Sequence, residues 1–251
     1  MKKKVFAFVG SRSSKRTTYK FVKNIISEIN KVKDIDYEIL TINDLNIRPC
    51  VGCTSCFKIG HCIQNDDIDL LKQKILESDL FIISAPVYMH GMPGEMKNII
   101  DRLATWAHTF RLAGKDILIV STCDTNGHTT VVDDLHIKML HMGGRIIGKY
   151  VGTNFIPAEL KTDSKIILLK NVEEFIPNIV NETLKKFDDK IVTNKFNESL
   201  FELYRQNQLL LLDTNQGTGE TEYWVNSGMI KYKTFQDYIN MLLSRSEDRI
   251  D

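Results

Sequence analysis

The apolar run VFAFVG at positions 5–10 is the segment that decides the fold. Every residue before its glycine is apolar, a pattern typical of a strand buried on both faces of a parallel sheet. Strands are also predicted at residues 37–42, 80–83, 117–120 and 145–151. Between them, apolar residues recur at helical spacing. This alternation of strands and helices indicates an α/β fold with an open, doubly wound parallel sheet.

The number of strands and the character of the later residues predict how the chain is divided. Five strands favour the flavodoxin-like order 2-1-3-4-5. The later part of the chain contains helical stripes instead, predicted over residues 172–187, 198–210 and 235–243. We therefore predict a flavodoxin-like domain over residues 1–155 and a helical C-terminal extension over residues 156–251.

Charge and hydropathy exclude several classes of partner. The 251 residues carry 33 Lys and Arg against 32 Asp and Glu, so we expect no broad attraction to nucleic acid or to an anionic membrane. No stretch approaches the roughly 18 uninterrupted apolar residues of a membrane span. The lysines at positions 2–4 precede an apolar stretch that is too short for a signal peptide. A reducing cytoplasm is therefore the expected location.

Three polar loops follow predicted strands, at the edge where doubly wound sheets bind ligands. Residues 10–18 (GSRSSKRTT) offer hydroxyls, backbone N–H groups and a helix N-terminus, which together suit a phosphate. Residues 84–94 (SAPVYMHGMPG) combine rigid backbone with an aromatic ring and a methionine, which suit a flat heterocycle. Residues 122–128 (TCDTNGH) could close over its other side. Each loop by itself is also compatible with an ordinary turn.

Cys50, Cys53, Cys56 and Cys62 form a compact C-x2-C-x2-C-x5-C run within a loop predicted over residues 48–64. Gaps of two residues let neighbouring thiolates converge on a small volume, as a metal or an iron–sulfur cluster requires. The spacing favours a cluster, and it leaves a closed zinc site and free or redox-active thiols as alternatives. Disulfides are not expected in a reducing compartment.

Taken together and in this order, these motifs resemble the NADPH-dependent FMN reductase family, a branch of the flavodoxin-like superfamily. The resemblance covers roughly residues 4–153. With Cys50 included, the cysteine run is similar to that of the iron–sulfur flavoproteins within this branch. The matching residues are Gly10-Ser11-x-Ser13 with Thr17-Thr18, Cys53-x-x-Cys56 with Cys62, and Pro86-Val87-Tyr88 with Lys97 and Asp101-Arg102.

The resemblance implies FMN as cofactor, with a [4Fe–4S] cluster bound by the four clustered cysteines. The phosphate of FMN would be held in the first loop by Ser11, Arg12, Ser13, Thr17 and Thr18. The other positions implied to contact FMN lie in the second and third loops, at Pro86, Val87, Tyr88, Met89, His90, Gly91, Thr122, Asp124 and Gly127.

The expected activity is NAD(P)H-dependent flavin oxidoreduction. NAD(P)H would be a transient donor, and a small-molecule oxidant or a ferredoxin-like carrier would accept the electrons. The alternatives are a cluster-free reductase of quinones, nitro compounds or free flavin, and, least favoured, a zinc-bound interaction module. His90 and His128 are weak candidates for proton donors. By analogy with the family, a homodimer or homotetramer is expected.

Two further expectations concern side chains outside the proposed sites. Glu95, Lys97, Asp101 and Arg102 are expected to cap and decorate the helix after the second loop rather than to react. Trp224 is expected to pack within the C-terminal extension.

Overall fold

The sheet is parallel throughout the part of the chain that the computed structural model describes, which is residues 2–127, 129–153, 167–169 and 172–247. Its strands there are β1 (Lys3–Val9), β2 (Ile35–Thr41), β3 (Leu80–Pro86), β4 (Asp116–Cys123), β5 (Arg145–Thr153) and β6 (Ile167–Leu169). They lie in the order β2-β1-β3-β4-β5-β6. The predicted flavodoxin-like order 2-1-3-4-5 is therefore confirmed, and β6 extends it at the β5 edge.

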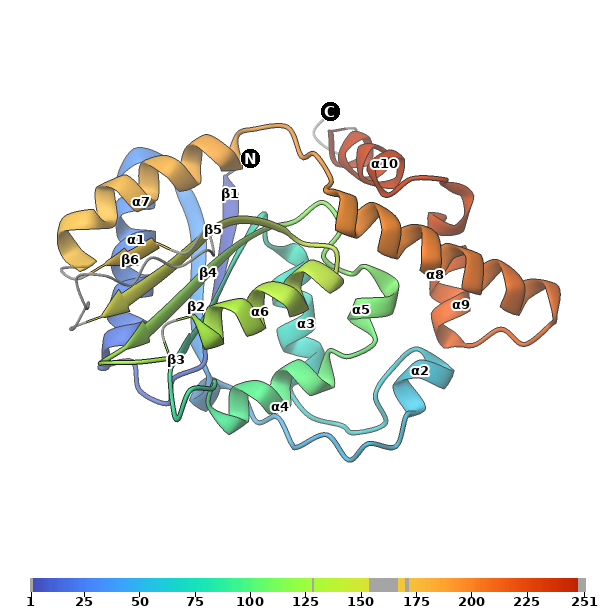
Figure 1. Ribbon diagram of the computed structural model, residues 1–251, viewed down its shortest axis with the longest axis horizontal. Coiled ribbons are helices and arrows are strands. Elements are labelled where there is room, and N and C mark those ends of the chain that lie inside the picture. Colours follow the sequence, from blue (N-terminus) through green and yellow to red (C-terminus); the bar gives the residue numbers. More distant parts are fainter. Residues whose placement is uncertain (1, 128, 154–166, 170–171, 248–251) are drawn as a thin grey trace.

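Helices cover both faces of the sheet (Figure 1). One face carries α1 (Thr17–Val32) and α7 (Val172–Phe187); the other carries α3 (Ile68–Glu77), α4 (Gly94–Arg102) and α6 (Thr130–His141). Short elements lie between them, namely η1 (Ile42–Asp44), α2 (Ser55–Ile59) and α5 (Trp106–Thr109). The last elements are α8 (Lys195–Asp213), α9 (Gly219–Asn226), η2 (Met229–Lys231) and α10 (Phe235–Glu247). Among the described residues, none of the helices is both long and apolar enough to cross a membrane.

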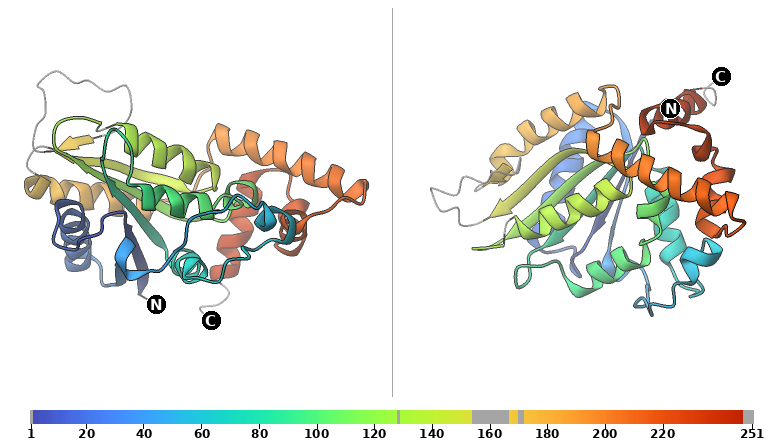
Figure 2. Two further views of the ribbon diagram at one scale, coloured as in Figure 1. Left: turned by 90° about the horizontal axis from the view of Figure 1, so that it is seen from below. Right: turned by 45° about the vertical axis from the view of Figure 1, so that its right-hand side comes forward.

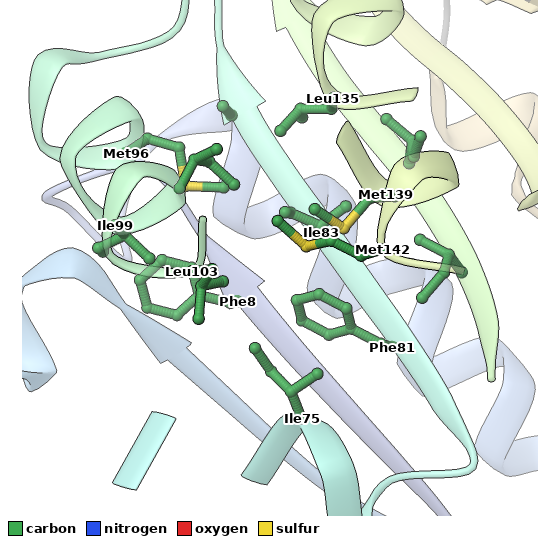
Figure 3. Packing of buried hydrophobic residues seen from close by; sticks show 14 of the residues in the cluster. Phe8, Ile75, Phe81, Ile83, Met96, Ile99, Leu103, Leu135, Met139 and Met142 are labelled. Carbon is green, nitrogen blue, oxygen red and sulfur yellow. The ribbon is translucent and has the colours of Figure 1, made fainter. Parts of the chain in front are cut away.

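Strand β1 lies between β2 and β3, inside the sheet, and its side chains are apolar on both faces. Phe6 and Phe8 enter the cluster beneath α3, α4 and α6, whereas Val5, Ala7 and Val9 enter the cluster beneath α1 and α7. None of the five is more than 3% exposed. Burial of that much apolar surface is the main favourable term in folding. Figure 3 shows how three helices fill the first cluster, with Ile75 from α3, Met96 and Ile99 from α4, and Met139 from α6.

The predicted helical C-terminal region is present, and it also contributes one short strand to the sheet. β6 pairs with β5, with Tyr150 opposite Ile167, and α7 packs on the sheet. Three apolar residues are too few to show a strand period, which is why the pattern did not reveal β6. α8, α9 and α10 do form a separate cluster around Phe201 and Trp224, both fully buried. The packing role expected for Trp224 is confirmed, and the predicted division at 155/156 lies outside the described residues.

Apolar residues at helical spacing after the second loop predict one helix that runs through Met96, Ile99, Ile100, Leu103 and Trp106, but the observed helix is shorter. α4 ends at Arg102, and α5 begins only at Trp106. The chain turns between them through hydrogen bonds from Leu103 N to Ile100 O (3.0 Å) and from Trp106 N to Leu103 O (2.9 Å). Leu103 and Trp106 both stay in the core cluster. Spacing alone cannot reveal such a break, because the residues on both sides of it face the same core.

One buried charge lies at the amino-terminal ends of the strands, opposite the carboxyl ends where the predicted loops begin. The ammonium group of Lys115, just before β4, donates to the carbonyl oxygens of Leu76 (3.1 Å) and Ser78 at the end of α3. Burial lowers the pKa of Lys115 to about 8. An unfolded lysine titrates near about 10.4, so the unfolded chain binds more protons between these values. Lys115 therefore makes stability rise with pH over that interval.

We predict that Lys115→Met removes this pH dependence. Relative to wild type, the variant should gain most in free energy of unfolding near pH 7, and the gain should shrink by up to about 3 kcal/mol as the pH rises to about 10.5. Urea denaturation of both proteins across this range measures the difference. The exposed Lys20→Met is the control, with a difference that stays constant. A constant difference for Lys115→Met as well would contradict the prediction.

Candidate functional site

The three predicted loops meet at one edge of the sheet. The strand register places Val9 of β1 opposite Ser84 of β3, and Pro86 of β3 opposite Thr122 of β4. The loops that follow these strands therefore begin side by side. The strand order also reverses next to β1, which has β2 on one side and β3 on the other. In doubly wound sheets such a reversal opens the crevice in which ligands bind.

The first loop leads into an α1 N-terminus that the described side chains do not cap. The N-cap residue Arg16 makes no side-chain capping bond, and the first turn carries no acidic residue. Ser11 and Ser13 bend the loop, since Ser11 Oγ accepts from Ser13 N (3.4 Å) and Ser13 Oγ accepts from Lys15 N (3.3 Å). Unsatisfied N–H groups and the positive end of the helix dipole favour an anion here.

The predicted phosphate residues divide into an outer and an inner set. Thr17 is exposed at the start of α1. Arg12 is exposed as well, but it pairs with Glu95 at the start of α4, and its Nε donates to Glu95 Oε1 (2.9 Å). Thr18 is buried and hydrogen-bonds Thr122 through the two hydroxyl oxygens, 2.6 Å apart. Thr18 and Thr122 therefore join the first loop to the third.

The second loop ends in a tight turn that projects into solvent. Tyr88 and Gly91 exchange backbone hydrogen bonds of 2.8 and 2.9 Å, and Met89 and His90 between them have φ values of +47° and +60°. Two successive non-glycine residues at positive φ are uncommon and cost conformational energy, which makes a functional turn the stronger interpretation. Tyr88 is 60% and Met89 is 97% exposed. The turn thus presents an aromatic ring and a thioether beside the predicted phosphate-binding loop, residues 10–18, which we call the phosphate cradle.

The second and third loops fit together at Gly127. Val87 N donates to Thr122 O (2.9 Å), which fixes the start of the second loop on the end of β4. Gly127 has a φ of +71°, and a Cβ atom there would lie 2.6 Å from Val87 Cγ1. Only glycine meets both conditions. Asp124 is exposed, its carbonyl accepts from Thr153 Oγ1 (3.2 Å), and His128 lies outside the described residues.

The four clustered cysteines occupy one segment around α2. Cys50 and Cys53 are exposed, and Cys56 and Cys62 are partly buried. Burial raises the pKa of Cys56, and the nearby Cys62, Cys50 and Cys53 raise it further, so the four thiols act on one another electrostatically. Hydrogen bonds from the side chain and backbone of Ser55 lower the pKa of Cys53. Within the described residues, no three His, Cys, Asp or Glu side chains are grouped closely enough to share one metal ion.

Helix α4 connects the three predicted ligand loops, which we call the flavin-type loops, to the cysteine segment. Its first turn holds Glu95, the partner of Arg12, and its next turn holds Asn98, whose Oδ1 accepts from Cys50 N (2.8 Å). At its end Arg102 donates to both carboxylate oxygens of Asp66 (2.7 and 2.9 Å) and to Arg48 O (2.7 Å). Both ends of the cysteine segment are therefore tied to one helix.

Arg102 is thus a structural anchor and not, as expected from the sequence, a surface residue of α4. Its side chain is 1% exposed and that of Asp66 is 2% exposed. Burial opposes ionisation of Asp66, but hydrogen bonds from Arg102 and from the backbone outweigh burial and lower its pKa. Burial also opposes the charge of Arg102, yet Asp66 and Cys62 raise its pKa. The signal in the sequence was the spacing of Asn98 and Arg102, four residues apart beside the apolar stripe.

The sequence profile of the NADPH-dependent FMN reductases matches residues 3–157, more than half of the chain. The chain belongs to the NADPH-dependent FMN reductase family. The recognition of this family from sequence motifs is thereby confirmed, and the protein is a flavin-dependent oxidoreductase.

Individual relatives agree with this assignment. The chain is 29% identical over 228 residues to an iron–sulfur flavoprotein of Archaeoglobus fulgidus, covering 88% of this chain and 99% of the relative. It is 27% identical over 165 residues to an iron–sulfur flavoprotein of Methanocaldococcus jannaschii, covering 59% of this chain and 85% of the relative. The structure of an apo NADH:FMN oxidoreductase is similar with a TM-score of 0.52 and 18% identity, covering 77% of this chain and 92% of that one. At that identity the structural likeness shows the fold alone.

The site fits the cofactor of the family. The uncapped α1 N-terminus, with Lys15 and Arg16 before it and no acid in its first turn, suits the phosphate of FMN. The 88–91 turn and Gly127 supply the flat, close-packed loops that an isoalloxazine ring requires. The individual contacts of the predicted FMN residues stay predictions.

The first prediction for this site concerns the buried ion pair. Arg102→Met leaves the carboxylate of Asp66 buried without its partner, which should lower the free energy of unfolding by about 3–5 kcal/mol. Urea denaturation measures the loss, and a second change, Asp66→Asn, should recover part of it. The exposed Lys97→Met, one turn and a half earlier on α4, should change stability by less than about 0.5 kcal/mol. Equal effects of the two substitutions would show that Arg102 is not an anchor.

The second prediction concerns the phosphate cradle. Thr17→Glu places a carboxylate where the phosphate of FMN is expected, so the Kd for FMN should rise by about tenfold or more. The Kd for riboflavin, which has no phosphate, should not rise. Flavin fluorescence quenching measures both constants. Asn24→Glu adds the same charge two turns further along α1 and serves as the control. A rise that is equal for FMN and riboflavin would place the phosphate elsewhere.

Proposed function

We propose that this family member is an iron–sulfur flavoprotein, in which Cys50, Cys53, Cys56 and Cys62 hold a [4Fe–4S] cluster next to FMN. The observation that carries the proposal is the placement of the cysteine segment on α4, the helix that also starts at the flavin-type loops. A helix of nine residues is about 13 Å long, so the two groups would be near neighbours. Two curated relatives that bear this name support it.

The donor set fits a cluster better than a single ion. Zinc needs all of its ligands around one point, whereas in a four-iron cluster each cysteine binds a separate iron at a corner. The four sulfurs must therefore surround a volume rather than meet. The pKa of Cys56 is raised by Cys62, Cys50 and Cys53, and this influence of all three other thiols on one sulfur supports a shared site.

The residues of the chain have separable tasks in this proposal. When bound, FMN and the cluster would supply the conversion of a hydride from NAD(P)H into single electrons. Ser11, Ser13 and Thr17 would orient FMN through its phosphate, and the 88–91 turn would support its ring. Ser55 would hydrogen-bond the sulfur of Cys53, and the charge of Arg102 would act on Cys62, which are the interactions that tune a cluster's potential.

The proposal extends to the partners. The acceptor would be a ferredoxin-like carrier or a small-molecule oxidant, since a site that delivers single electrons serves both. The exposed 88–91 turn supports a partner surface at the flavin, as expected for a homodimer or homotetramer whose subunits meet there. A reducing cytoplasm stays the expected location, since iron–sulfur clusters and free thiols persist in reducing compartments.

A cluster-free, NAD(P)H-dependent reductase of quinone, nitro or flavin substrates is the second candidate. The observation that favours it is the exposure of Cys50 and Cys53, which free thiols would tolerate without a ligand. In that case FMN alone would pass electrons to the substrate, and the phosphate cradle would still bind FMN through its phosphate.

The deciding measurement is the content of FMN, iron and acid-labile sulfide in protein purified without oxygen. We expect about four irons and four sulfides per FMN. Cys50→Ser should lose most of the iron but keep FMN, and Val51→Ala, which changes an exposed residue beside Cys50, should keep both. Stoichiometric FMN without iron after anaerobic reconstitution would leave the cluster-free reductase, and one zinc without flavin would support an interaction module instead.

A further inference from the structure

The middle of the cysteine segment rests on the C-terminal helices and not on the sheet. α2 and the first turn of α9 lie against each other, as two views of the molecule show (Figures 1 and 2). Gly219, the first residue of α9, lies directly on the end of α2. A Cβ atom on Gly219 would be 2.1 Å from Gly60 N and 2.4 Å from Ile59 C. The two backbones approach this closely only because position 219 carries no side chain.

A second contact fixes the same two elements from the side. His108 of α5 lies between them, with its ring 5.4 Å from the ring of Phe57 in α2. On its other side, His108 Nδ1 is 3.0 Å from Glu220 Oε1 in α9. The carbonyl of His108 also accepts from Trp224 Nε1 (2.9 Å). α5 thus joins α2 to α9 through side-chain and backbone contacts.

The far side of this contact is rigid. Trp224 of α9 and Phe201 of α8 are fully buried, and their ring centroids lie 5.2 Å apart. The ring of Phe110 meets both edge to face, at 6.0 and 5.6 Å, and the ring of Phe235 lies tilted against Phe201 at 5.4 Å. Buried aromatic clusters of this kind allow little displacement. α9 is therefore a fixed support for α2 rather than a loose surface element.

We propose that Gly219 and Glu220 of α9 are positioning residues for the cluster, holding Cys56 and Cys62 at the spacing that the cluster needs. Cys56 is the second residue of α2, and Cys62 follows Gly60 by two positions. α4 holds Cys50 and Asp66 at the two ends of the segment, so α9 supports the part that α4 does not reach. This inference rests on the proposed function, and it gives the C-terminal helices a role in the redox site.

The test uses the full-length protein with Gly219→Ala. Its Cβ would displace the end of α2, so after anaerobic reconstitution the iron and sulfide bound per FMN should fall, with cluster affinity lowered by about tenfold or more. The FMN content should not change, because the cradle lies on other elements. Gly217→Ala is the matched control, since its Cβ would meet only Thr221 side-chain atoms at 3.5 Å or more. It should keep wild-type iron, sulfide and FMN.

Glu220→Gln tests the same contact without a steric change and decides the matter if Gly219→Ala does not fold. It keeps a side chain of the same shape but removes the negative charge beside His108. We expect it to retain iron while altering the electron paramagnetic resonance spectrum and the midpoint potential of the reduced cluster. A role limited to stability would leave both at their wild-type values.

A thiol measurement separates this inference from the proposed function. In iron-free protein, the alkylation rate of each cysteine is followed by peptide mass spectrometry. Gly219→Ala should raise the rates of Cys56 and Cys62 by about tenfold, leaving the exposed Cys50 as in wild type. If the wild-type protein takes up no iron, the cluster is refuted. The alkylation rates would still show whether α9 supports α2. Wild-type alkylation rates and wild-type iron in Gly219→Ala, together with a wild-type spectrum and midpoint potential in Glu220→Gln, would overturn the inference.

Discussion

The burial of β1 on both faces is the constraint on which the rest of the structure depends. A strand with apolar side chains on both sides must be covered by helices above and below, and only parallel neighbours with helical crossovers provide that cover. Parallel strands in turn place their carboxyl ends at one edge. The first, second and third loops meet at that edge for this reason, and the hydrogen bond between Thr18 and Thr122 joins two of them directly.

Helix α4 converts that arrangement into a two-part site. It begins at the flavin-type loops, packs its apolar stripe on the sheet, and uses its remaining face to hold the cysteine segment through Asn98 and Arg102. A cofactor loop and a cysteine loop that are far apart in an extended chain are thus attached to one rigid element. Burying the pair of Arg102 with Asp66 carries a desolvation penalty. The pair fixes the C-terminal end of the cysteine segment in one position on α4.

The C-terminal helices add support from outside the family's core fold. α8, α9 and α10 bury their own aromatic cluster and present Gly219 to the backbone of α2. Glycine at this position is explained by the approach of two backbones, since no turn with positive φ requires it. The cysteine segment therefore lies between α4 on the sheet and the helical C-terminal unit, and it contacts both.

The sequence by itself determined the strand order, the family and the three loops, because hydrophobic periodicity and motif order are local properties of the chain. It also marked the four cysteines as one group, since their spacing is short. Only the tertiary structure showed that β6 extends the sheet and α7 packs on it, that Arg102 is buried with Asp66, and that Gly219 lies on Gly60. Each of these features depends on contacts between residues that are distant in the chain. A local sequence pattern does not record which residue packs against Arg102 or Gly219, so it cannot show why a charge or a glycine is needed at that position.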